Sequence, residues 1–153
     1  MNRIADALEL LTSQHDEIDV LIAELAASAS PSTRNETIML LVEKLTLHLA
    51  LEQELFYPAV SSALSPAVYA ELLAEHGEIK RVLADMLWLE SEDTRFARKL
   101  TALQNLQCWH SMWQERELFE KLAETMTPEQ LAELGSRLNV WLDGTVAELA
   151  IAA

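Results

Sequence analysis

The sequence predicts an all-α fold, an up-down-up-down four-helix bundle with an additional C-terminal helix. Only three Gly and four Pro occur in 153 residues, whereas residues that favour helices are abundant. Apolar residues recur at helical spacing over four long segments, and the polar breaks between these segments are short. Short connections make neighbouring helices antiparallel. We expect one domain over residues 1–153, with the bundle at about 3–125.

Two helices are expected in the first half of the chain. The first runs from about residue 3 to 28, with His15 on its apolar face. Residues 28–35 contain Pro31 and are expected to form a loop. The second helix then runs from about 35 to 63. Pro58 is expected to kink or end this helix, because proline lacks an amide hydrogen.

Three further helices are expected in the second half. Ser65 and Pro66 are typical of an N-cap and a first helical position, and they start a helix that reaches about residue 90. A fourth helix spans about 94–125. Thr127 and Gln130 form a capping box that starts a fifth helix at about 128–148. The apolar residues of this helix predict packing outside the bundle or against another subunit, so a homodimer is one alternative.

Charge and hydropathy exclude several classes of function. The formal net charge is −14, with 11 basic and 25 acidic residues, which argues against a nucleic-acid surface and against binding to anionic lipid. The N-terminus has no basic region followed by an uninterrupted apolar stretch, because Asp6, Glu9 and Asp16 break it, so neither a signal peptide nor a membrane span is expected. A single cysteine, Cys108, cannot form an internal disulfide. These features predict a cytoplasmic protein that binds neither nucleic acid nor membrane.

All four histidines belong to an internal repeat. The pattern His-x-Glu-Ile begins at His15 and again at His76, and a second histidine follows after 33 residues at His48 and after 34 residues at His110. Each histidine interrupts an apolar helix face at a similar depth from the start of its helix. In a four-helix bundle, the four side chains are therefore expected to meet near mid-height.

Each second histidine is followed by a Glu-x-Glu-Leu-Phe segment, but the spacing differs. Glu52 lies four residues after His48, whereas Glu115 lies five residues after His110. On a regular helix, a four-residue step turns about 40° and a five-residue step about 140°. We expect a π-bulge between His110 and Glu115 that turns Glu115 inward. The alternative is a regular helix with Gln114 inward and Glu115 in solvent.

Buried histidine and glutamate side chains are costly unless they are paired or bind a metal ion. Their convergence predicts a metal centre. Imidazole and carboxylate donors without cysteine suit iron or manganese, and zinc is a further alternative.

The order of these residues resembles the hemerythrin-like, or HHE cation-binding, domain family over about residues 8–125. The resemblance implies a non-haem di-iron centre inside the bundle, with two Fe ions. It also implies that the terminal ligands are His15, His48, His76 and His110. The implied carboxylate bridges are Glu52 and Glu115.

One departure from the family concerns the third helix. Oxygen-carrying hemerythrins have a further histidine one turn before the third-helix ligand, where this chain has Leu72. A nearly symmetric centre with an open position at each metal is expected.

The predicted function is to bind or sense oxygen, nitric oxide, peroxide or iron. A peroxide-consuming or ferroxidase-type di-iron enzyme is the alternative, followed by an interaction bundle that has lost its metal.

Overall fold

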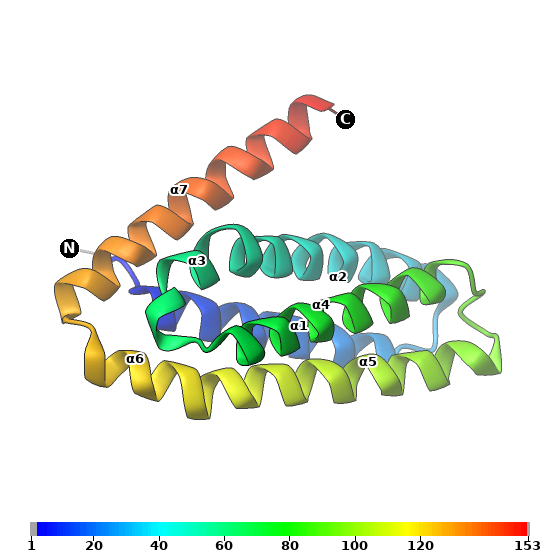
Figure 1. Ribbon diagram of the computed structural model, residues 1–153. Helices are drawn as coiled ribbons and strands as arrows, with labels where there is room; N and C mark the ends of the chain where they lie inside the picture. Colours follow the sequence, from blue (N-terminus) through cyan, green and yellow to red (C-terminus); the bar gives the residue numbers. More distant parts are fainter. Residues whose placement is uncertain (1–2, 153) are drawn as a thin grey trace.

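The computed structural model describes residues 3–152, and within this range it contains helices and no strands (Figure 1). The predicted all-α class is confirmed. No helix in this range combines the length and the apolar character that crossing a bilayer requires. In chain order, the elements are α1 (Ala7–Ala27), α2 (Pro31–Leu51), η1 (Glu52–Phe56), α3 (Tyr57–Ala59), η2 (Ser61–Ala63), α4 (Pro66–Leu87), α5 (Thr94–Trp113), η3 (Gln114–Phe119), α6 (Glu120–Thr125) and α7 (Pro128–Ala152).

The bundle consists of four helical rods, which are α1, α2–η1–α3, α4 and α5–η3–α6 (Figure 1). The second rod is continuous through α2, η1 and α3, and the fourth is continuous through α5, η3 and α6. The rod of α1 packs against α2 and α5, while α4 packs against α5 and α2. Successive rods run in opposite directions, so the predicted up-down-up-down order is confirmed.

The first two helices begin at residues other than those predicted. α1 starts at Ala7, because the Asp6 carboxylate accepts hydrogen bonds from the amides of Leu8 and Glu9, and the Glu9 side chain accepts one from the Asp6 amide. α2 starts at Pro31, where a loop was expected. Ser30 caps it, and proline suits the first helical position because no amide hydrogen is needed there.

The remaining boundaries are close to the prediction. Ser65 caps α4, and Thr127 and Gln130 exchange the two hydrogen bonds of a capping box before α7. The second rod ends at Ala59, a few residues before its predicted end and one residue after Pro58. α7 reaches Ala152, several residues beyond its predicted end.

Two apolar clusters fill the interior on either side of a polar layer. One cluster lies toward the α1–α2 and α4–α5 connections and includes Ile18, Leu45, Ile79 and Leu103. The other lies toward α6 and α7 and includes Leu11, Leu72, Leu118 and Leu138. The buried polar side chains are His15, His48, Glu52, His76, Gln107, His110, Ser111 and Gln114.

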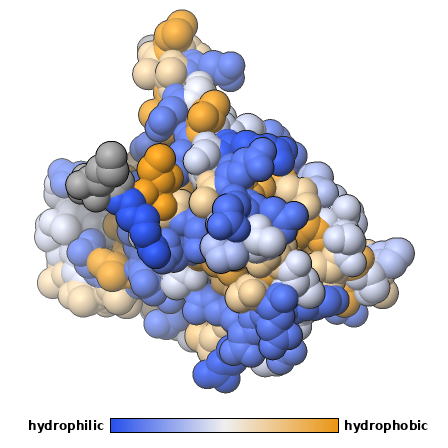
Figure 2. All heavy atoms as spheres, turned by 90° about the vertical axis from the view of Figure 1, so that its left-hand side faces the viewer, coloured by the Kyte–Doolittle hydropathy of each residue, from blue (hydrophilic) through white to orange (hydrophobic). Residues whose placement is uncertain are grey.

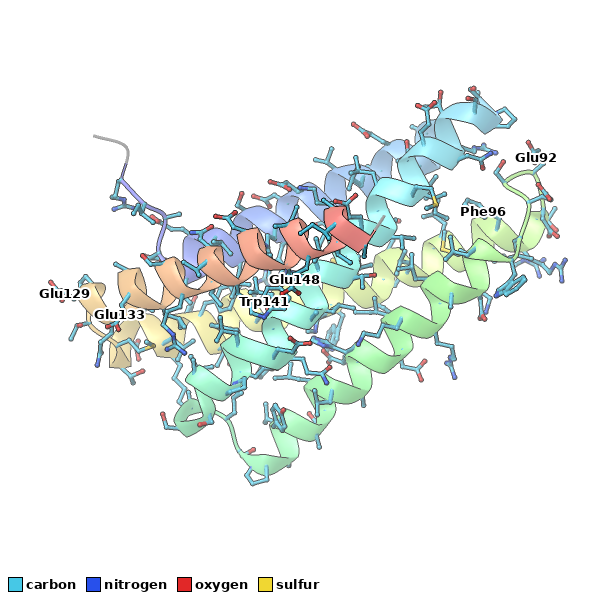
Figure 3. The ribbon with its side chains drawn as sticks, turned by 90° about the horizontal axis from the view of Figure 1, so that it is seen from above. Glu92, Phe96, Glu129, Glu133, Trp141 and Glu148 are labelled. Carbon is cyan, nitrogen blue, oxygen red and sulfur yellow. The ribbon has the colours of Figure 1, made fainter. Side chains whose placement is uncertain are left out.

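The fifth helix packs on the outside of the bundle. α7 contacts α1 and α2, and its partly buried Trp141 packs on the second apolar cluster (Figure 3). Its C-terminal end projects from the bundle (Figure 1) and carries apolar side chains at the tip of the projection (Figure 2). Val146, Leu149 and Ile151 there are exposed. Homodimer formation through this helix stays a prediction.

Candidate metal centre

One histidine from each rod reaches the polar layer. His15, His48, His76 and His110 are at most 1% exposed. The ring centroids of His15 and His48 are 4.9 Å apart, and those of His76 and His110 are 5.1 Å apart. The convergence predicted from the repeat is therefore present.

The Glu52 carboxylate lies between the two histidine pairs. Its Oε1 is 3.2 Å from His48 Nε2 and 3.9 Å from His15 Nε2. Its Oε2 is 2.9 Å from His76 Nε2 and 3.0 Å from His110 Nε2. Two triads result, each with its candidate ligand atoms within 4.8 Å of one another. We call His15, His48 and Glu52 subsite A, and Glu52, His76 and His110 subsite B.

Several atoms of the cluster are buried without a hydrogen-bond partner. They include the Nε2 atoms of His15 and His48 and the Oε1 atom of Glu52. Buried polar atoms are usually paired, and leaving one unpaired costs about 1–3 kcal/mol. A cation in subsite A would satisfy all three atoms at once. The donor set therefore fits a metal ion.

Charge within the cluster shifts the pKa of its members. Burial alone would raise the pKa of Glu52, but the charges of His48 and His110 hold it well below its usual value. Burial lowers the pKa of His110, yet the negative charge of Glu52 and hydrogen bonds to Glu52 and Glu75 raise it to about 9. The pKa of His15 is also raised, whereas burial lowers that of His48. Glu52 therefore stays ionised.

These pKa shifts predict a pH dependence of metal affinity. With a pKa of about 9, His110 carries a proton at neutral pH in the metal-free protein, and a metal ion on its Nε2 must displace that proton. Zn²⁺ affinity is expected to rise as pH increases from about 6 to 9. Calorimetric titration in two buffers of different ionisation enthalpy measures the proton released. Equal affinity and no proton release across this range would contradict the prediction.

The outer nitrogen, Nδ1, of His48 and of His110 donates a hydrogen bond to a neighbouring helix. His48 Nδ1 donates to Gln14 Oε1 at 2.8 Å, and His110 Nδ1 donates to Glu75 Oε2 at 2.7 Å. Gln14 directly precedes His15, and Glu75 directly precedes His76. In each half of the repeat, a residue of the first helix thus accepts a hydrogen bond from the histidine of the second helix. Such contacts fix the ring orientation and leave Nε2 toward the cluster.

Glu115 does not join the cluster, and the prediction that it points inward is wrong. Its carboxylate accepts a hydrogen bond from His15 Nδ1 at 2.7 Å, and its side chain is 38% exposed. α5 stays regular through Trp113, so the residue four positions after His110 faces inward. That residue is Gln114, whose Nε2 lies 3.1 Å from His110 Nε2. The structure therefore has the alternative arrangement, in which Gln114 faces inward.

The predicted π-helical turn exists but lies further along the chain. η3 spans Gln114–Phe119, and since it begins after His110, it does not rotate Glu115 toward the cluster. A second π-helical segment, η1, was not predicted. In η1 the Tyr57 amide donates to the Glu52 carbonyl, which is the five-residue hydrogen bond of a π-turn.

The π-turn in η1 brings Tyr57 to the cluster. On a regular helix, a residue five positions after Glu52 would point about 140° away from it. Here the Tyr57 hydroxyl donates to Glu52 Oε2 at 3.0 Å and lies 3.2 Å from His76 Nε2. Sequence reasoning missed Tyr57. Pro58, which lacks an amide hydrogen, is a local sign of an irregular helix at this point.

Comparisons with known proteins relate the chain to a family of known domains. The model of the hemerythrin HHE cation-binding domain matches residues 6–122. A DNA nickase from Nostoc sp. is 25% identical over 122 residues, which cover 80% of this chain and 35% of that protein. The chain thus spans about a third of the length of this relative.

A crystal structure of similar fold is also known. It is that of a hemerythrin HHE cation-binding domain-containing protein from Mycobacterium kansasii, with a TM-score of 0.80 and 23% identity. The match covers 92% of this chain and 86% of the other. At this identity, the similarity shows the helical fold.

Proposed function

Since the chain belongs to the hemerythrin HHE cation-binding domain family, we propose that the His/Glu cluster is a non-haem di-iron centre that binds a small molecule such as oxygen, nitric oxide or peroxide, or that responds to iron. One observation carries the proposal: Glu52 directs one carboxylate oxygen to each of two histidine pairs. A carboxylate shared in this way is suited to hold two metal ions side by side.

The donor set leaves room for an exogenous ligand. Each subsite offers two imidazole nitrogens and one oxygen of Glu52. An octahedral ion accepts about six donors, so solvent and a small ligand have positions at both subsites. Imidazole and carboxylate donors without cysteine favour iron, with manganese or zinc as alternatives.

The chain's own residues provide the surroundings of the metal ions. Glu52 brings negative charge into the layer, and Gln14, Glu75 and Glu115 hold three of the imidazole rings in place. The apolar clusters on both sides exclude bulk water. Bound iron would supply electrons to, or accept them from, a small ligand.

A di-iron enzyme of peroxide-consuming or ferroxidase type is the second candidate. It is favoured by the Tyr57 hydroxyl, a proton donor that lies within the buried cluster. Sustained consumption of peroxide or oxygen by the iron-loaded protein would support the enzyme, whereas a stable adduct would support the binder. We do not propose the nickase activity of the Nostoc relative for this chain, because the net charge of −14 disfavours contact with DNA. A cytoplasmic location also remains a prediction.

Metal analysis tests the proposal directly. Aerobically purified protein is expected to contain about two iron ions per chain and to show the near-ultraviolet absorption of oxo-bridged iron. His48→Ala removes one donor of subsite A and is expected to lower the iron content. A wild type without metal, together with an unaltered His48→Ala variant, would end the proposal.

A further inference from the structure

An aromatic ring lies beside His15 in subsite A and beside His76 in subsite B. Tyr57 and Phe119 each stand nine residues after the second histidine of their half. The Tyr57 ring centroid is 5.5 Å from that of His76, and the Phe119 ring stacks on His15 at 6.1 Å with an interplanar angle of 7°. Subsite B therefore has a phenol hydroxyl where subsite A has only a phenyl ring.

The buried amide of Gln114 is also part of subsite B. Gln114 Nε2 donates to the Tyr57 hydroxyl at 2.7 Å and lies 3.1 Å from His110 Nε2. Gln114 is fully buried, and its Oε1 has no hydrogen-bond partner. Its equivalent in the other half, four residues after the histidine, is Glu52, which serves both subsites. The two subsites thus share the Glu52 carboxylate, whereas the neutral donors Gln114 and Tyr57 lie at subsite B.

Metal ions would free these donors for another partner. A cation on His110 Nε2 would occupy the nitrogen that the Gln114 amide now faces. A cation on Glu52 Oε2 would compete for the oxygen that now accepts the hydrogen bond of the Tyr57 hydroxyl. An N–H of Gln114 and the O–H of Tyr57 are then available at subsite B. Phe119 offers subsite A no comparable group.

We infer that the two subsites are inequivalent and that subsite B takes the small exogenous ligand, held by hydrogen bonds from Tyr57 and Gln114. The inference rests on the proposed function, because it requires metal in both subsites. It names hydrogen-bond-accepting ligands, such as small anions and oxygen-derived species, as the class that subsite B prefers. A buried donor adds most when its acceptor is charged.

Azide binding to the iron-loaded protein tests the inference. Iron content is measured first, and the azide dissociation constant is then obtained by optical titration of the wild type, Tyr57→Phe and Gln114→Leu. Each variant removes donors with little change in side-chain volume. Each is expected to keep its iron and to bind azide about 10-fold more weakly, the effect of losing one hydrogen bond to a charged acceptor.

Phe119→Tyr is the matched control, because it gives subsite A a hydroxyl at the corresponding position. Its azide affinity is expected to equal that of the wild type. Unchanged affinity in both donor variants, or tighter binding in Phe119→Tyr, would overturn the inference. If Tyr57→Phe loses iron, the Gln114→Leu and Phe119→Tyr variants decide it.

Two further readouts separate the possible failures. A wild type without iron refutes the proposed function, whereas iron-loaded variants with unchanged azide affinity refute only the inference. Thermal unfolding of the metal-free variants reports any structural role of Tyr57 and Gln114. A weakened azide affinity in a variant that keeps its iron and its metal-free stability supports ligand contact rather than loss of structure.

Discussion

Glu52→Gln is expected to abolish metal binding at both subsites. Glu52 is the one residue common to the two triads, and its two oxygens face different histidine pairs. The substitution keeps the side-chain shape but replaces an anionic oxygen with an amide nitrogen that cannot coordinate a cation. Iron content is expected to fall from about two ions per chain to near zero, whereas His48→Ala removes a donor from subsite A alone. Elemental analysis of the purified variants measures both effects.

Glu54→Gln is the matched control for this prediction. Glu54 belongs to the same π-helical segment but is exposed, so its substitution removes the same charge from the chain without touching the cluster. It is expected to keep the wild-type iron content. Two irons retained in Glu52→Gln would show that the carboxylate is not the shared ligand.

The metal-free protein gives a second readout for Glu52→Gln. In the wild type, the low pKa of Glu52 stabilises the fold above the ordinary carboxyl pKa, and this contribution is lost as pH falls through the lowered value. The variant leaves protonated imidazoles without their buried counter-charge. Its loss of thermal stability is therefore expected to be greater at about pH 6 than above about pH 9, where His110 loses its proton in the wild type as well.

The inward positions could be predicted because they follow the regular helical period. His15, His48, His76 and His110 interrupt otherwise apolar stripes, and Glu52 lies one turn after His48. Burial of a stripe is enforced by the large apolar surface around it, so a polar residue within the stripe is buried as well. The predicted helices and the order of the bundle follow from the same pattern.

The predictions that fail rest on the repeat and not on the helical period. Matching the Glu-x-Glu-Leu-Phe segments paired Glu115 with Glu52, but the backbone after His110 stays regular and places Gln114 inward. The extra residue is instead accommodated in η3. Tyr57 departs from prediction in the opposite way: Pro58 marks an irregular helix, but the regular period does not show that a π-turn rotates Tyr57 onto the cluster. The duplicated segments thus give one carboxylate that faces both histidine pairs and one buried amide.

Gly135→Ala is expected to destabilise the protein by about 1–3 kcal/mol, the usual cost of overpacking a close contact. Gly135 is buried in α7, where the helix crosses the start of α1. A Cβ there would lie 2.6 Å from the Ala5 carbonyl oxygen, 2.8 Å from the Asp6 carbonyl carbon and 2.9 Å from the Ala7 amide nitrogen. All three are backbone atoms, so no side-chain rotation relieves the contact, and either α7 or the capped start of α1 must move.

Gly144→Ala is the internal control, because the same substitution in the same helix meets no atom within 4 Å. Alanine exceeds glycine in helix stability by about 0.5–1 kcal/mol, so Gly144→Ala is expected to raise the melting temperature while Gly135→Ala lowers it. Thermal unfolding of the two variants and the wild type measures both shifts. Opposite signs separate the close contact at the start of α1 from helix propensity, which is the same for both. A Gly135→Ala variant stabilised as much as Gly144→Ala would show that α7 does not pack on α1 through this glycine.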